Sequence, residues 1–130
     1  MAPTSSNPLK VFLADDSSLI RDRVKAMLAA SDMVVVGQAS TPAGSIDGIL
    51  SARPHVVVLD VQLEGGTGLE VLRAVRSAAP EIAVVVFSNS ASPAYRKRYL
   101  SDGAAGFLDK STEFDQLAKA VADTCRRAAA

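Results

Sequence analysis

Short apolar runs alternate along the chain with segments in which apolar residues recur every three or four positions. The runs are rich in β-branched residues and lack polar alternation, which is typical of strands buried on both faces. They lie at Leu9–Ala14, Met33–Val36, Val56–Leu59, Ile82–Phe87 and Ala105–Leu108. The pattern therefore predicts five buried strands.

The segments between these runs have a helical period, with apolar side chains on one face. The faces comprise Ile20, Val24, Met27 and Leu28; Ile46, Ile49 and Leu50; Leu69, Leu72 and Val75; and Phe114, Leu117, Ala118 and Val121. A shorter helix is predicted over Ala94–Leu100, opened by Pro93 with Ser92 as its N-cap. Strands that alternate with helices predict an α/β fold: a doubly wound, five-stranded parallel sheet with helices on both faces.

Length and composition fit one globular domain. The chain has 130 residues, of which 48% are hydrophobic, and its 14 basic and 14 acidic residues give a net charge of zero. This balance argues against a surface built to bind nucleic acid or an anionic membrane. Residues 1–8 hold prolines and small polar residues with nothing to bury, so we expect a flexible leader followed by one domain over residues 9–130.

Targeting signals and cysteine chemistry are not evident. The first eight residues contain no basic region, and no apolar stretch approaches the roughly 20 residues of a membrane helix. Cys125 is the one cysteine, which excludes an intramolecular disulfide and cysteine-based zinc clusters. We therefore expect a cytoplasmic protein without a membrane partner.

Polar residues follow four of the predicted strands, at the point where each strand ends. Asp15 and Asp16 follow the first strand, Asp60 the third, Ser88 the fourth and Lys110 the fifth. The carboxyl ends of parallel strands meet at one edge of the sheet, and ligands bind there. We therefore expect these side chains to converge at that edge.

Three carboxylates brought together repel one another and favour a bound cation. An all-oxygen ligand set selects a hard ion, Mg²⁺ or Mn²⁺. With a metal, an ammonium and a hydroxyl, the site has the parts that hold a phosphoryl group, and a carboxylate can itself be the nucleophile that forms an aspartyl phosphate. Taken singly, each residue has a more ordinary explanation as a helix cap, a turn residue or a solvated charge, so the joint placement carries the prediction.

At these residues the chain resembles the receiver domain of bacterial two-component response regulators, from Lys10 to about Arg127. The matching segments are Phe-Leu-Ala-Asp15-Asp16-Ser, Val-Val-Val-Leu-Asp60-Val-Gln-Leu-Glu-Gly-Gly-Thr-Gly68-Leu, Val-Val-Val-Phe-Ser88-Asn and Gly103-Ala-Ala-Gly106-Phe107-Leu-Asp-Lys110-Ser. The resemblance implies the flavodoxin-like strand order 2-1-3-4-5, with the first and fifth helices on one face and the middle three on the other.

The resemblance also implies a role for each matching residue. Asp60 would accept a phosphoryl group from a phosphohistidine. Asp15, Asp16, Asp60 and the backbone carbonyl of Gln62 would hold Mg²⁺ or Mn²⁺. The remaining roles are carried over to four further residues: Ser88 and Lys110 would bind phosphoryl oxygens, Phe107 would be the aromatic switch residue, and Gly68 would open the turn into the third helix.

Partners follow from the same resemblance. The phosphodonor would be a sensor histidine kinase or a phosphotransfer protein, and the target an unidentified downstream protein; a homodimer is left open, and no direct nucleic-acid contact is expected. The surface that changes would be the fourth helix, fifth strand and fifth helix. We expect the exposed aromatic and basic side chains of this face to contribute to docking: Tyr95, Arg96, Lys97, Arg98 and Tyr99.

Four positions depart from the common receiver pattern. Ser111 stands after Lys110 where proline is common, so we expect a trans bond there and a differently shaped loop. Glu64 replaces a common proline and adds negative charge near the site. Asn89 follows Ser88 where a small residue is usual, and Phe107 lacks the hydroxyl of the common tyrosine.

Other functions stay open at this point. A degenerate receiver would bind partners without phosphorylation. A phosphatase that uses an aspartyl phosphate needs a second acid two residues after the nucleophile, where this chain has Gln62, and a flavin or nucleotide module needs a phosphate loop where Asp15 and Asp16 stand. The sequence is similar to receivers of helix-turn-helix transcription regulators, and it fits either a single-domain regulator or the receiver of a longer protein.

Overall fold

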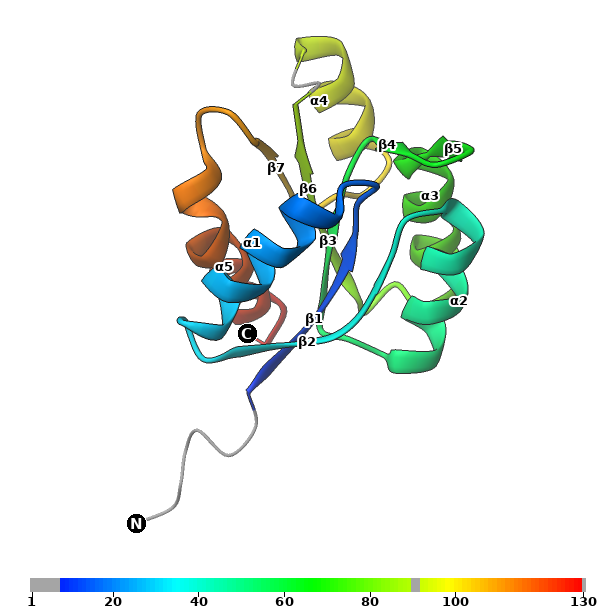
Figure 1. Ribbon diagram of the computed structural model, residues 1–130. Coiled ribbons are helices and arrows are strands. Elements are labelled where there is room, and N and C mark those ends of the chain that lie inside the picture. The colour runs from blue at the N-terminus through cyan, green and yellow to red at the C-terminus, as the bar shows by residue number, and fades with distance from the viewer. Residues whose placement is uncertain (1–7, 90–91, 130) are drawn as a thin grey trace.

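A five-stranded parallel sheet forms the centre of the protein, with helices on both faces (Figure 1). The computed structural model describes residues 8–89 and 92–129, so the predicted leader lies outside the described residues except for Pro8. The strands are β1 (Leu9–Ala14), β2 (Met33–Ala39), β3 (Val56–Leu59), β6 (Ala83–Ser88) and β7 (Gly106–Asp109), and a separate hairpin is formed by β4 (Gln62–Leu63) and β5 (Gly66–Thr67). The sheet order is β2-β1-β3-β6-β7. Counted within the sheet, this is the predicted order 2-1-3-4-5.

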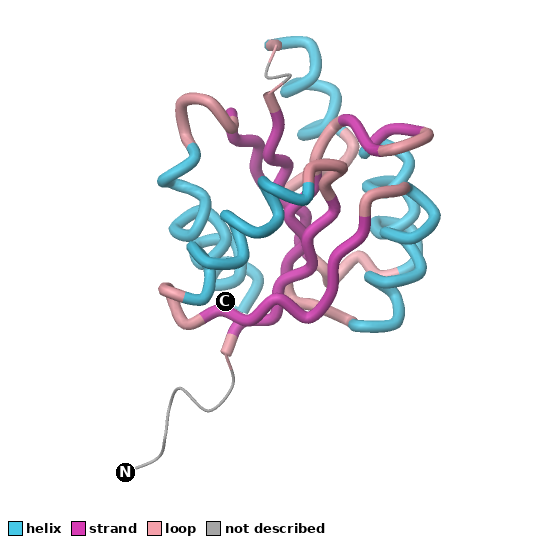
Figure 2. The backbone as a smooth tube through the Cα atoms, in the orientation of Figure 1, coloured by secondary structure: helices cyan, strands magenta, loops and turns pink. Residues whose placement is uncertain are grey.

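The helices lie in two layers, one on each side of the sheet (Figure 2). They are α1 (Ser18–Ala29), α2 (Pro42–Ala52), α3 (Gly68–Ala78), α4 (Pro93–Ser101) and α5 (Leu117–Ala129), with a 3₁₀ turn, η1 (Phe114–Gln116), before the last. Helices α1 and α5 cover one face, and α2, α3 and α4 the other (Figure 1). The predicted fold class and distribution of helices are confirmed.

Alternation along the strands divides the core into two clusters, because successive side chains of a strand point to opposite faces. Val11 and Leu13 pack in the cluster that includes buried residues of α1 and α5. Phe12 and Ala14 pack in the other, with buried residues of α2 and α3. The central strand β3 is buried along its whole length, as the apolar runs predicted.

The prediction of burial on both faces is wrong for β2. This strand is at the edge of the sheet, and its burial alternates, with Val34 and Val36 41% and 37% exposed. It also extends to Ala39, beyond the apolar run that marked it. The β4–β5 hairpin was not predicted, because two-residue strands are too short to show a period.

Helix starts follow the expected capping chemistry. The Ser17 hydroxyl accepts a hydrogen bond from the Ile20 amide at 3.2 Å at the start of α1. The Ser92 hydroxyl accepts one from the Tyr95 amide at 3.3 Å, which confirms the predicted N-cap of α4. These caps satisfy amides that have no partner within the helix.

Candidate functional site

The sheet itself positions three of the predicted site residues. Asp15, Asp60 and Lys110 each come one residue after a strand, and their amides donate to carbonyls of neighbouring strands at 3.1, 2.9 and 3.1 Å. Each residue therefore continues the hydrogen-bond ladder beyond its own strand. This fixes the three backbones at the carboxyl edge of the sheet, from which their side chains converge.

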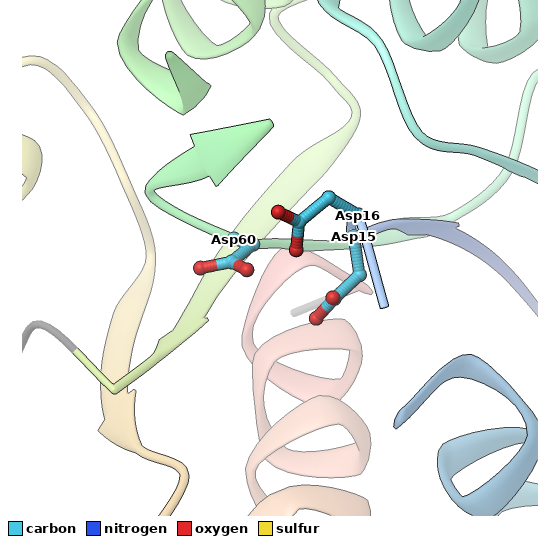
Figure 3. Close-up of side chains that lie close together, drawn as sticks. All are labelled: Asp15, Asp16 and Asp60. Carbon is cyan, nitrogen blue, oxygen red and sulfur yellow. The ribbon is translucent and has the colours of Figure 1, made fainter. Parts of the chain in front are cut away.

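The Lys110 ammonium lies between two carboxylates. Its Nζ is 2.6 Å from Asp15 Oδ2 and 3.0 Å from Asp60 Oδ2, and the three side chains are only 6%, 8% and 9% exposed. Asp16 is exposed, and one carboxylate oxygen from each of Asp15, Asp16 and Asp60 lies within 4.8 Å of the others (Figure 3). Two buried carboxylates, one exposed carboxylate and one buried ammonium thus share this edge of the sheet.

Backbone groups orient the two buried carboxylates. Asp15 Oδ1 accepts a hydrogen bond from the Ser17 amide at 2.9 Å, and Asp60 Oδ1 accepts one from the Gln62 amide at 3.4 Å. Arg21 donates to the Asp15 carbonyl oxygen at 2.5 Å. Nothing in the sequence pattern indicated this contact, because arginine on an amphipathic helix is ordinarily a solvated residue.

Gly68 gives α3 room to begin against the backbone of Asp60. A Cβ at this position would lie against the Asp60 carbonyl oxygen, far inside van der Waals contact. The Gly68 amide also donates to the Val61 carbonyl at 2.7 Å. The glycine therefore allows the close approach that holds the loop after β3.

Burial and ion pairing affect the titration of the site. Burial raises the pKa of Asp15, and this effect outweighs the hydrogen bond and charge of Lys110 that act in the opposite direction. Burial alone would lower the pKa of Lys110, but the hydrogen bond to Asp15 and the charges of both carboxylates raise it. Lys110 is accordingly protonated at neutral pH.

A small cavity opens beside these groups. Its volume is about 200 Å³, and its lining includes Asp16, Asp60, Ser88, Asn89 and Lys110. Pockets for organic ligands are usually larger, roughly 300–1,000 Å³. The volume suits a phosphoryl group better than a flavin or a nucleotide.

Phe107 lies on the same face of the sheet as Ser88, level with the residue two positions before Ser88 on β6. It pairs with Val86 in the register of β6 and β7, and its ring is buried. The ring of Tyr99 packs edge-on against the Phe107 ring, with 6.1 Å between the ring centroids. The Arg96 guanidinium carbon lies over the Phe107 ring, 5.1 Å from its centroid. Phe107 thus connects the edge that carries the site to α4.

The expectation that Tyr99 is exposed is wrong. Tyr99 is 2% exposed, because it is the side chain through which α4 packs on the sheet, whereas Tyr95 is 44% exposed. Burial raises the pKa of Tyr99 to about 12. The docking face predicted at α4 therefore has one exposed tyrosine.

The loop after Lys110 is closed by local hydrogen bonds. The Lys110–Ser111 peptide is trans, as expected without a proline. The Asp109 carboxylate accepts hydrogen bonds from the amide and the hydroxyl of Ser111, and Glu113 Oε1 accepts one from the Asp109 amide. The two hydrogen bonds from Ser111 lower the pKa of the Asp109 carboxyl.

The residues present fit a divalent cation. The donors are carboxylate oxygens, two of the three acidic residues are buried, and the Lys110 ammonium already lies between these two. Hard cations such as Mg²⁺ prefer such oxygen ligands. Gln62 lines the same cavity, and its carbonyl stays a predicted ligand.

Comparison with known proteins identifies the family. A family model described as the response regulator receiver domain matches residues 11–122. The chain belongs to this family. It is therefore a receiver domain of two-component systems, and a signalling domain.

Relatives of this receiver are longer regulators. The DNA-binding transcriptional activator DevR/DosR of Mycobacterium tuberculosis is 34% identical over 116 residues, which are 88% of this chain and 54% of that protein. The response regulator GacA of Pseudomonas protegens is 33% identical over 114 residues, 87% of this chain and 54% of that protein. The chain thus spans about half the length of these relatives.

Solved structures of receiver domains have the same fold as this chain. The signal receiver domain of NarL from Mycobacterium tuberculosis superposes with a TM-score of 0.86 at 33% identity, covering 92% of this chain and 98% of that one. The response regulator domain of Thermotoga maritima CheB gives a TM-score of 0.80 at 25% identity, covering 94% and 96%. Within the part of this chain that the structure describes, no helix is long and apolar enough to span a membrane.

Proposed function

We propose that this receiver accepts a phosphoryl group on Asp60 from a phosphohistidine, in a step that depends on Mg²⁺ or Mn²⁺. The observation that carries the proposal is the joint position of Asp60, Lys110 and the two other carboxylates at one edge of the sheet. The small cavity beside them supports it.

The chemistry is a displacement at phosphorus. An Asp60 carboxylate oxygen attacks the phosphorus, the bond from phosphorus to the histidine nitrogen breaks, and the imidazole keeps the electron pair and takes a proton. Lys110, which contacts Asp60 Oδ2 at 3.0 Å, neutralises charge that builds up on the phosphoryl oxygens. Ser88, at the end of β6 and in the lining of the same cavity, would donate to another of these oxygens.

Asp15, Asp16, Asp60 and the Gln62 carbonyl are the proposed metal ligands. When bound, the cation neutralises the carboxylates and draws charge from the phosphoryl oxygens. Asp15 and Asp60 would exchange part of their contact with Lys110 for this metal. Lys110 would then be released toward the phosphoryl group.

Phosphorylation would favour one of two packings of the same elements. The new acceptor oxygens at Asp60 attract Ser88 and Lys110, and Phe107 follows Ser88. Because Phe107 contacts Tyr99 and Arg96, the change reaches the face formed by α4, β7 and α5. This face would dock the downstream partner.

We propose partners of the kinds that the family suggests: a sensor histidine kinase or phosphotransfer protein as donor, and a downstream protein as target, in the cytoplasm. DevR/DosR is named as a DNA-binding transcriptional activator. If this receiver is part of such a regulator, its target is a DNA-binding domain of the same protein. The residues proposed here contact the phosphoryl group and not nucleic acid.

Intact-mass spectrometry with acetyl phosphate tests the proposal. With Mg²⁺ the chain should gain one phosphoryl group, and it should gain none with EDTA or in Asp60→Asn. Asp47→Asn, on the exposed face of α2, is a matched control and should still be phosphorylated. A native chain that gains no phosphoryl group would instead identify a degenerate receiver that binds partners without phosphorylation.

A further inference from the structure

Helix α4 is exposed over most of its surface and carries adjacent cations. Every residue from 92 to 98 is exposed, and Tyr99 is the side chain that anchors the helix. Arg96 lies over Phe107 and pairs with Glu113 at 3.8 Å, so it faces β7 and η1. Lys97 and Arg98 line hollows on another side of the helix, next to α3.

An apolar groove lies between α4 on one side and α3 with the β4–β5 hairpin on the other. Helix α3 and the hairpin lie side by side in Figure 1. Its volume is about 390 Å³, within the range of pockets that bind ligands. The lining is formed mainly by Val61, Leu69, Ala94, Tyr95 and Tyr99, with Arg98 as the charged member. No residue of β7 or α5 is among the described lining residues, so this groove lies on the α3 side of α4 and shares only α4 with the α4–β7–α5 face.

A second hollow adjoins this groove and shares Ala94 and Arg98 with it. Lys97, Arg73 and Asp102 also line it, and Arg73 pairs with Asp102 at 2.8 Å. Among the side chains that the structure describes, no carboxylate pairs with Lys97 or Arg98. The two cations thus give the apolar groove a positively charged rim.

We propose that this groove binds an acidic polypeptide segment, with one apolar side chain against Leu69 and Tyr95 and carboxylates against Lys97 and Arg98. An apolar anchor beside complementary charges is the usual composition of a peptide interface. A polypeptide is favoured over nucleic acid because the apolar groove supplies the anchor and the net charge of the chain is zero. The binding does not depend on phosphorylation of Asp60.

The experiment is a titration of the ¹⁵N-labelled chain with a short synthetic peptide of glutamate, aspartate and serine that carries one central leucine. EDTA and the absence of a phosphodonor keep the result independent of the proposed phosphorylation. The amides of Thr67, Leu69, Ala94 and Arg98 should shift with saturation, and binding should weaken as salt is added. Peptides with serine in place of leucine, or lysine in place of the acids, should not saturate.

Charge reversal supplies the matched variants. Arg98→Glu and Lys97→Glu should each weaken binding about tenfold, since an exposed attraction is replaced by a repulsion of similar size. Lys25→Glu, an equal charge change on exposed α1, should bind normally. The proposal is overturned if the acidic peptide fails to saturate, if its shifts map to another surface, if Lys25→Glu weakens binding as much as Arg98→Glu, or if only a single-stranded oligonucleotide occupies the groove.

Discussion

Replacing Lys110 with methionine tests how the acidic edge is held together without metal. The substitution keeps an unbranched side chain of similar length but removes the charge that lies 2.6 Å from Asp15 and 3.0 Å from Asp60. Both carboxylates would stay buried with no cation between them. The folded state should therefore lose stability.

The expected loss follows from the burial of all three groups. Removing one partner of a buried ion pair destabilises a protein by about 3–5 kcal/mol. The lower end of this range applies here, about 3 kcal/mol. Burial already raises the pKa of Asp15, so proton uptake by Asp15 in the variant relieves part of the repulsion between Asp15 and Asp60. A carboxyl with a raised pKa in the folded state binds its proton more readily there, so the deficit should shrink as pH falls from neutral toward 4.

Urea unfolding followed by circular dichroism at neutral pH, with EDTA present, measures this loss. Lys119→Met is the matched control, because the Lys119 side chain is 82% exposed and its ammonium pairs with Asp123 at 3.3 Å. The control should lose less than about 0.5 kcal/mol. Equal losses in the two variants would refute the assignment of Lys110 as the counter-ion of the site.

Mg²⁺ supplies a second arm of the same experiment. Without the competing ammonium, the carboxylates should bind Mg²⁺ more tightly, so saturating Mg²⁺ should stabilise Lys110→Met more than the native chain. An equal or smaller stabilisation would contradict the proposed competition between Lys110 and the metal.

Three further predictions concern the surrounding structure. Gly68→Ala should lose at least about 2 kcal/mol in urea unfolding, because the new Cβ meets the Asp60 carbonyl. Gly106→Ala should change stability little, because the nearest atom to its Cβ would be 3.9 Å away. Similar losses in the two variants would contradict a close approach at Gly68. The folded state keeps the Tyr99 proton up to about pH 12, whereas the unfolded chain releases it near pH 10. The free energy of unfolding should therefore fall by about 2–3 kcal/mol between these two pH values. Tyr99→Phe should reduce this fall and Tyr95→Phe should not. Ser17→Ala should lose about 1 kcal/mol through the N-cap of α1, and an unchanged unfolding midpoint would count against that cap.

The sheet could be predicted from the sequence because its strands are apolar runs and its polar residues mark where they end. Leu9–Ala14 and Val56–Leu59 have the predicted bounds. The edge strand β2 was misjudged, because Met33–Val36 is as apolar as a central strand and only the strand order shows that it lies at an edge of the sheet. Apolar composition therefore indicates a strand, but not how many of its faces are covered.

The convergence of the site could also be predicted, since each strand end places its residue at the same edge. What could not be predicted depends on side-chain direction. The bridging position of Lys110, the inward turn of Tyr99 and the separation of Arg96 from Lys97 and Arg98 arise from tertiary packing. The run from Tyr95 to Tyr99 looks like one cluster in the sequence, whereas the helix distributes it over three directions.

The location of the phosphoryl group tests the central claim most directly. Reduction of the phosphorylated chain with borohydride converts an acyl phosphate of aspartate into homoserine, which peptide mass spectrometry can place in the sequence. We predict homoserine at position 60 and at no other position. Homoserine at position 15 or 16, or a phosphoryl group that resists reduction because it is on a hydroxyl such as Ser88, would contradict the account.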